Sequence, residues 1–168
     1  MPFQSTVFFS TGLSVPGEIW SNTPIRSQSY ILQSVLASQN IIGATAYTIV
    51  SEGIARAGGT GAFAGFLIMP KDYALYGLAG TALSPTMTLA NEVQADILSM
   101  GTIVVTLPAA AAIGDVVLYD TTTGALQTVP PGTALPVGTA SANAYVDYYT
   151  VTAAGLAVIT VNPNVIVP

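Results

Sequence analysis

Residues 113–129 read IGDVVLYDTTTGALQTV, and this stretch decides the fold because it joins two β-prone runs by a polar turn. In the first run, 116–119, apolar side chains alternate between the two sides of the chain, so a strand here is apolar on both faces. Asp120 opens the turn, and Gly124 provides the positive φ that a hairpin loop of about three to five residues usually needs. The stretch therefore predicts a β-hairpin whose first strand is covered on both sides.

The rest of the chain repeats this pattern of short β-prone runs separated by turn residues. We count eight or more such runs, with turn signals at intervals of about eight to twelve residues. This spacing predicts an all-β fold, either a β-sandwich or jelly roll or a partly closed barrel. The clearest expected strands lie at 43–50, 66–69, 102–107, 116–119, 137–140, 145–152 and 156–161.

The N-terminal segment differs from the rest, and we expect residues 1–40 to form an extended arm on a body of residues 41–168. The arm is rich in Ser, Thr and Gln and is interrupted by Pro16, Gly17 and Pro24. Its aromatic side chains are too numerous for a free, solvated tail, so the arm should lie against its own domain or a neighbour. A short helix is expected over residues 31–37.

The composition restricts the partners. The chain has 168 residues, enough for one domain, and only 7% of them are charged, against about 25% in an ordinary soluble domain. Such a surface suits a protein that works inside an assembly. The net charge is -5 with no cluster of Lys or Arg, so no nucleic-acid partner is expected. No apolar run reaches the roughly 20 residues of a membrane span, so no membrane partner is expected.

The sequence offers few side chains that could act in catalysis, because it contains neither His nor Cys. This excludes the Ser/His/Asp triad and thiolate metal sites. In a strand, Glu92 and Asp96 would lie about 13 Å apart, beyond the roughly 5 to 9.5 Å of glycosidase carboxylates. We interpret them as surface acids, and Asp115 and Asp120 as acids that stabilise turns. We expect no enzyme, no catalytic residue and no cofactor, with a calcium site between loops as an alternative.

Three tyrosines gather in one expected strand, 145–152, namely Tyr145, Tyr148 and Tyr149. Exposed aromatic rings in such a strand could bind sugar or protein. Packing in the core or at its rim is the simpler interpretation, and we favour it.

Several landmarks occur in a characteristic order along the chain. They are Gly17 and Glu18, then Asn22, Pro24 and Arg26, then Gly43 to Tyr47, then Ala64, Gly65 and Phe66, then Met87 and Thr88 before a strand ending at Gly101, and finally Gly114, Asp115 and Val116 before the hairpin with Gly124. Taken together, they resemble the structural cement proteins of tailed double-stranded DNA bacteriophages. The resemblance spans about residues 6 to 161, with Asn22 and Arg26 each displaced by one position relative to Pro24.

This resemblance implies a β-sandwich or jelly-roll body without enzymatic activity. Family members bind the outside of the assembled capsid, where symmetric copies clamp capsomers together. We therefore expect a virion protein on the outer capsid surface, a dimer or trimer, whose partners are the major capsid protein and neighbouring copies of itself. The expected contact residues, all in the N-terminal arm, are Phe8, Phe9, Trp20, Pro24, Arg26 and Tyr30.

Two alternatives to this function stay open at the level of sequence. The tyrosines of 145–152 favour a carbohydrate-binding or fibre-type β module of a virion. A jelly roll could also be a coat subunit that forms the shell itself. Expression alone separates this second alternative from a cement protein, because a coat subunit assembles cages.

Overall fold

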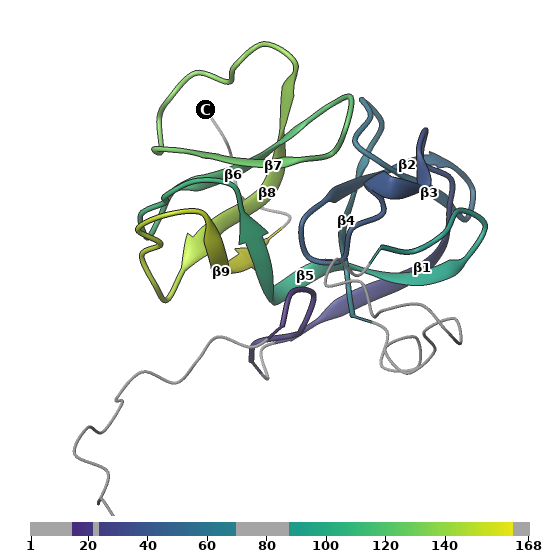
Figure 1. The fold of residues 1–168 in the computed structure, drawn as a ribbon, viewed down its shortest axis with the longest axis horizontal. Coiled ribbons are helices and arrows are strands. Elements are labelled where there is room, and N and C mark those ends of the chain that lie inside the picture. Colours follow the sequence, from purple (N-terminus) through teal and green to yellow (C-terminus); the bar gives the residue numbers. More distant parts are fainter. Residues whose placement is uncertain (1–14, 22–23, 70–87, 163–168) are drawn as a thin grey trace, which may run out of the picture.

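The computed structural model describes residues 15–21, 24–69 and 88–162. Within these ranges the chain forms nine strands and one turn of 3-10 helix, η1 (Ala37–Gln39). This confirms the all-β prediction, in the form of a partly closed, barrel-like sheet (Figure 1). The strands are β1 (Arg26–Leu32), β2 (Ala46–Ser51), β3 (Ile54–Ala57), β4 (Phe63–Leu67), β5 (Gln94–Leu107), β6 (Val116–Asp120), β7 (Leu126–Val129), β8 (Thr139–Asp147) and β9 (Gly155–Val161).

The first half of the sheet closes on itself. Its strands follow the order β1-β3-β2-β4-β5, and β1 also pairs with β5, so these five strands form a ring. The pair of β1 with β3 is parallel, and the other pairs are antiparallel. Figure 1 shows this half to the right of β5.

The second half continues from β5 in the order β5-β9-β8-β6-β7, and all of its pairs are antiparallel. It lies to the left of β5 in Figure 1. Strand β7 ends this half and has β6 as its ladder partner. A single bridge between Thr45 and Ala125 connects the start of β7 to the first half.

Strand β5 belongs to both halves and is the longest strand, with 14 residues. Residues up to Met100 pair with β1 and β4, and residues from Gly101 onward pair with β9. Gly101, at the change of partner, has a φ of 129°, and a Cβ atom here would lie 2.9 Å from a methyl group of Ile25. A glycine is therefore needed where β5 passes from one half to the other.

The predicted hairpin is confirmed as β6 and β7, with β6 buried on both faces up to Tyr119. Asp120 Oδ1 accepts hydrogen bonds from the backbone N–H groups of Thr122 (2.8 Å) and Thr123 (2.7 Å). These donors lower the pKa of Asp120 below its ordinary value. Gly124 has a φ of 78°, and its carbonyl accepts a 3.0 Å hydrogen bond from Ala46 of β2. The turn thus fastens the second half to the first.

Other local predictions need correction. The helix expected over 31–37 is wrong, because Ile31 and Leu32 belong to β1. The strands expected at 137–140 and 145–152 are one strand, β8, which ends at Asp147. Small side chains in its middle, such as Ala142 and Ala144, are fully buried but carry no β signal.

The expected arm of residues 1–40 also contains sheet. Residues 26–32 form β1, which pairs with β3 and β5. Residues 17–20 hydrogen-bond to β5 as well. Residues 17–20 and 26–32 are thus hydrogen-bonded to the sheet, and Phe8 and Phe9 lie outside the described residues.

Two hydrophobic clusters form the core. One fills the ring of the first half around Tyr47, Leu67 and Ile97. The other fills the second half but also includes Phe66 and Leu98 from the first. Phe63 of β4 stacks on Tyr119 of β6 with 6.0 Å between ring centroids. The two halves thus share apolar contacts as well as β5.

Tyr47 is the anomaly of this core. Its side chain is fully buried, and its hydroxyl has no hydrogen-bond partner among the described residues. Burial raises the pKa of this hydroxyl far above its ordinary value. A buried hydroxyl without a partner costs stability.

We expect Tyr47→Phe to stabilise the protein by about 1 kcal/mol, because it removes this unpaired group and keeps the ring. Chemical denaturation measures the change. Tyr30→Phe is the matched control, since the Tyr30 hydroxyl bonds to Gln28 on the surface, and its effect should stay within about 0.5 kcal/mol. A loss of stability in Tyr47→Phe would mean that the hydroxyl has a partner after all.

Candidate functional site

Within the described residues, the acidic side chains are spread over turns, loops and strands. Glu92 lies in the turn before β5, while Asp96 lies on β5 and accepts a hydrogen bond from Ser29. Asp115 Oδ2 accepts a 2.8 Å bond from the N–H of Ala112, which fits the predicted role in a turn. No group of three acidic side chains able to hold a metal ion occurs in the described ranges. The same ranges contain no helix long and apolar enough to cross a membrane.

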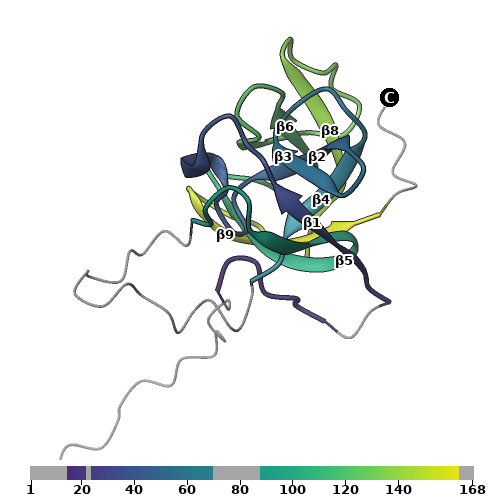
Figure 2. The same ribbon diagram turned by 90° about the vertical axis from the view of Figure 1, so that its right-hand side faces the viewer.

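The feature that stands out instead is a group of aromatic side chains beside the N-terminal segment. Residues 15–21, which we name the strap, run along the edge of β5 that faces away from β9 (Figure 2). Gly17 N–H donates to the Val104 carbonyl (2.8 Å), and Trp20 N–H donates to the Thr102 carbonyl (2.9 Å). The strap thereby covers an edge of β5 that would otherwise be unpaired, and it fixes the position of Trp20.

The chain makes a tight turn directly after β8. Tyr148 has a φ of 61°, and the N–H of Tyr149 donates a 2.7 Å hydrogen bond to the carbonyl of Asp147. This is the hydrogen bond of a γ-turn with a positive φ at its centre, a rare and strained conformation. The turn leaves the side chains of Tyr148 and Tyr149 exposed to 49% and 44%.

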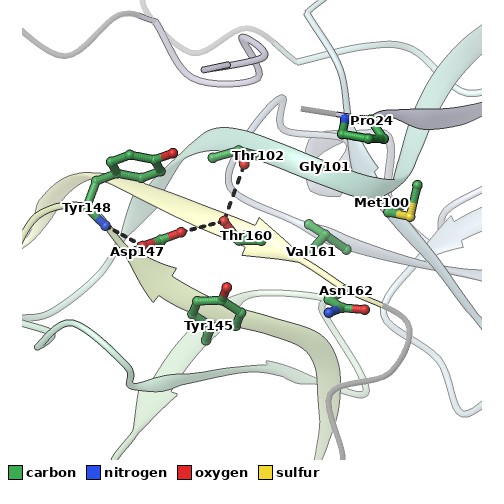
Figure 3. A pocket seen from close by; sticks show the side chains of 10 residues that line it. All are labelled: Pro24, Met100, Gly101, Thr102, Tyr145, Asp147, Tyr148, Thr160, Val161 and Asn162. Atoms are coloured by element: carbon green, nitrogen blue, oxygen red, sulfur yellow. Dashed lines mark hydrogen bonds between the residues drawn. The ribbon is translucent and has the colours of Figure 1, made fainter. Parts of the chain in front are cut away.

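Asp147 holds this turn from both sides. Its Oδ1 accepts a 2.8 Å bond from the N–H of Tyr148, and its Oδ2 accepts a 2.8 Å bond from the hydroxyl of Thr160 on β9. Thr160 in turn lies 3.3 Å from the hydroxyl of Thr102 on β5 (Figure 3). The turn is therefore anchored to β9 and, through Thr160 and Thr102, to β5.

An aromatic ring of the strap contacts one of the aromatic rings in the turn after β8. Trp20 and Tyr149 contact edge to face, with centroids 6.0 Å apart and an interplanar angle of 88°. The rings of Tyr148 and Tyr149 lie 6.5 Å apart. We name Trp20, Tyr148 and Tyr149 the aromatic face. Aromatic side chains in such a position are typical of binding surfaces.

A shallow hollow of about 360 Å³ lies beside the aromatic face. Its lining combines aromatic, apolar and polar side chains from four parts of the chain (Figure 3). Pro24 and Met100 stand at one end of it and Tyr148 at the other. The lining residues are Pro24, Met100, Gly101, Thr102, Tyr145, Asp147, Tyr148, Thr160, Val161 and Asn162.

The contact residues predicted from the sequence fall into three groups. Trp20 and Pro24 lie beside the tyrosines of 145–149, Trp20 at the aromatic face and Pro24 at the hollow. Arg26 and Tyr30 lie on β1, where Arg26 pairs with Met100 of the hollow and its Nε donates to Ser99 Oγ (3.0 Å). Phe8 and Phe9 are outside the described residues. For all three groups, the role as contact residues stays a prediction.

The sequence predicted that the three tyrosines lie close together, but it placed all three in one strand, which is wrong. They do not share one strand, since Tyr145 is in β8 and Tyr148 and Tyr149 follow it. Met100 and Thr160 were not expected at all. They reach the hollow through the pairing of β5 with β1 and β9, which no local signal could have revealed.

Comparisons with known proteins agree with this structure. A family model described as structural cement protein (E217 gp24/Pam3 gp6) matches residues 3–162. A search of curated proteins gave no match. A chain from the solved structure "The capsid of Myoviridae Phage XM1" has the same fold, with a TM-score of 0.58, 16% identity, and coverage of 97% of this chain and 99% of that one. Because the family model covers most of the sequence, the chain belongs to the phage structural cement proteins, a family of structural proteins and not of enzymes.

Proposed function

We propose that this protein binds the outer surface of a phage capsid and stabilises the contacts between capsid subunits. The match to the structural cement family over residues 3–162 carries the proposal. The major capsid protein and neighbouring copies of the chain would be its partners. Copies would act as a dimer or trimer, so that several weak contacts add up through multivalency.

The chemistry of the surface supports binding by burial of neutral groups. Only 7% of the residues are charged, so few ion pairs can form with a partner. Large apolar side chains are exposed in several places of the described chain. Those more than half exposed are Val35, Leu36, Val50, Ile113 and Val137. Interfaces of this kind gain their free energy from desolvation and hydrogen bonds.

The negative net charge of the chain supports a position on the outer surface of the capsid. The interior of a DNA phage capsid faces densely packed phosphate groups. A chain with a net charge of -5 and no basic cluster would be repelled there. On the outside it meets no such field.

The proposed arm is now restricted to the residues that precede the strap. The strap and β1 hold their positions by backbone hydrogen bonds to β5, so they are part of the body. We propose that residues 1–14 reach a neighbouring subunit, and that the strap fixes the point from which they leave.

Two deletions separate arm from body. Removing residues 1–14 should change the melting temperature by less than about 2 °C and weaken attachment to capsids. Removing residues 1–30 deletes the strap and most of β1, which opens the ring, so this variant should fail to fold. Circular dichroism and co-sedimentation with capsid shells measure both. Full attachment of the shorter variant would remove the arm from the proposal.

Salt dependence tests the mechanism directly. The purified protein is mixed with capsid shells of the parent phage from which the native copies have been stripped. We expect the dissociation constant to change less than about threefold between about 0.05 and about 0.5 M NaCl, because few charges take part. Circular dichroism across the same range checks that the fold is constant. A loss of binding of about tenfold or more would show that ion pairs dominate. Assembly of cages by the expressed protein alone would instead identify a coat subunit.

A further inference from the structure

We infer that the aromatic face, Trp20 with Tyr148 and Tyr149, is the anchor by which this protein grips the capsid, and that it fits an uncharged, apolar patch of the shell protein. The inference rests on the proposed function and adds to it the surface and the chemistry of the partner. Four observations lead to it.

The first observation is the strained backbone. A bulky residue with a positive φ is an outlier, and such strain gathers at functional sites. Tyr148 has this conformation at 61°, with its turn closed by the bond from Tyr149 N–H to the Asp147 carbonyl. Glycine would adopt it without strain. The tyrosine ring is therefore present at a cost to the fold, and stability does not explain it.

The second observation is that the rings are both exposed and held. Tyr149 is 44% exposed, yet its ring is packed at 6.0 Å against Trp20, whose backbone is bonded to β5. Asp147 fixes the turn that carries Tyr148. Rigid aromatic side chains bury a large area and lose little conformational entropy on binding. Trp and Tyr in such positions are the commonest anchors of protein interfaces.

The third observation separates a protein partner from a sugar. A sugar needs free polar groups beside the rings to hydrogen-bond its hydroxyls. Here both carboxylate oxygens of Asp147 already accept hydrogen bonds from inside the protein. The hydroxyls of Thr102 and Thr160 lie within hydrogen-bond distance of each other. Because these neighbours already bond inside the protein, the polar groups that remain for a partner are chiefly those of the aromatic side chains themselves, and an aromatic face of this kind suits a largely apolar protein surface.

The fourth observation is location. Trp20 belongs to the strap, and the strap continues directly from residues 1–14. Trp20 follows residue 14 by six positions, so the aromatic face and the segment that we propose to reach a neighbouring subunit belong to neighbouring parts of the sequence.

The strain at Tyr148 allows a test in which stability and binding change in different directions. Tyr148→Gly relieves the backbone and removes the ring. We expect its melting temperature to be unchanged or higher by about 1 to 3 °C, and its affinity for stripped capsid shells to fall at least about tenfold. Tyr149→Ala, at a position without positive φ, should lose affinity to a similar degree.

Glu92→Gly is the matched control. Glu92 is exposed, has nearly the same φ of 66° and lies before β5, away from the aromatic face. This variant should also keep or gain thermal stability, but it should bind capsid shells with the affinity of the unchanged protein. Tyr148→Phe, which keeps the ring, should bind within about twofold.

The outcomes separate the inference from the function on which it rests. If the unchanged protein does not bind stripped shells, the proposed function itself fails. If it binds, but Tyr148→Gly and Tyr149→Ala bind equally well, the function stands and the aromatic face is not the anchor. If these two variants keep capsid affinity and lose binding to a soluble glycan panel that the unchanged protein recognises, the face is a sugar site and the inference is overturned.

Discussion

Strand β5 hydrogen-bonds to both halves of the molecule, and the remaining structure depends on this sharing. Its first residues close the ring with β1 and β4, and its last residues begin the second half with β9. Gly101 is the point at which the partners change. One strand of 14 residues thus joins the two halves of the sheet directly. The hairpin turn at 120–125 adds a second fastening, through the bond between Gly124 and Ala46.

This arrangement explains how the surface that we propose to bind the capsid keeps its shape. The strap lies on the free edge of β5, and the turn after β8 is anchored through Asp147 to Thr160 on β9, the strand next to β5. Strand β5 therefore fixes the position of both parts of the aromatic face, one directly and the other through β9. Such rigidity would favour the binding that we propose, because a preformed surface loses little conformational entropy when it binds.

The sequence predicts those parts of the fold that are decided by near neighbours. The hairpin follows from Asp120, which bonds to backbone groups of the turn, and from the positive φ of Gly124. Strand β1 could not be seen in the same way, because RSQSYIL carries few apolar residues and most of it is exposed. It is a strand because β3 and β5 are placed on either side of it. Such long-range pairing leaves no pattern in the local sequence.

The candidate site shows the same division. Three tyrosines and Trp20 were visible as aromatic residues, but a regular alternation from 145 to 152 concealed the turn. That turn exists because the Asp147 side chain competes for the backbone N–H of Tyr148, an effect that alternation alone does not reveal. The neighbours from β5 and β9 are supplied by the topology. The family resemblance indicated the class of function, and the surface that we propose for it could be defined only from the geometry.

Hydrogen exchange under native conditions tests the central role of β5 most directly. If β5 joins the two halves into one cooperative unit, amides of β5, of β2 and of β8 should share the highest protection and exchange through one global opening, within about 1 kcal/mol of each other. Protection of β2 and β8 that differs by more than about 2 kcal/mol, with β5 divided at Gly101 between the two levels, would contradict it. The two halves would then be independent units, and β5 only the link between them.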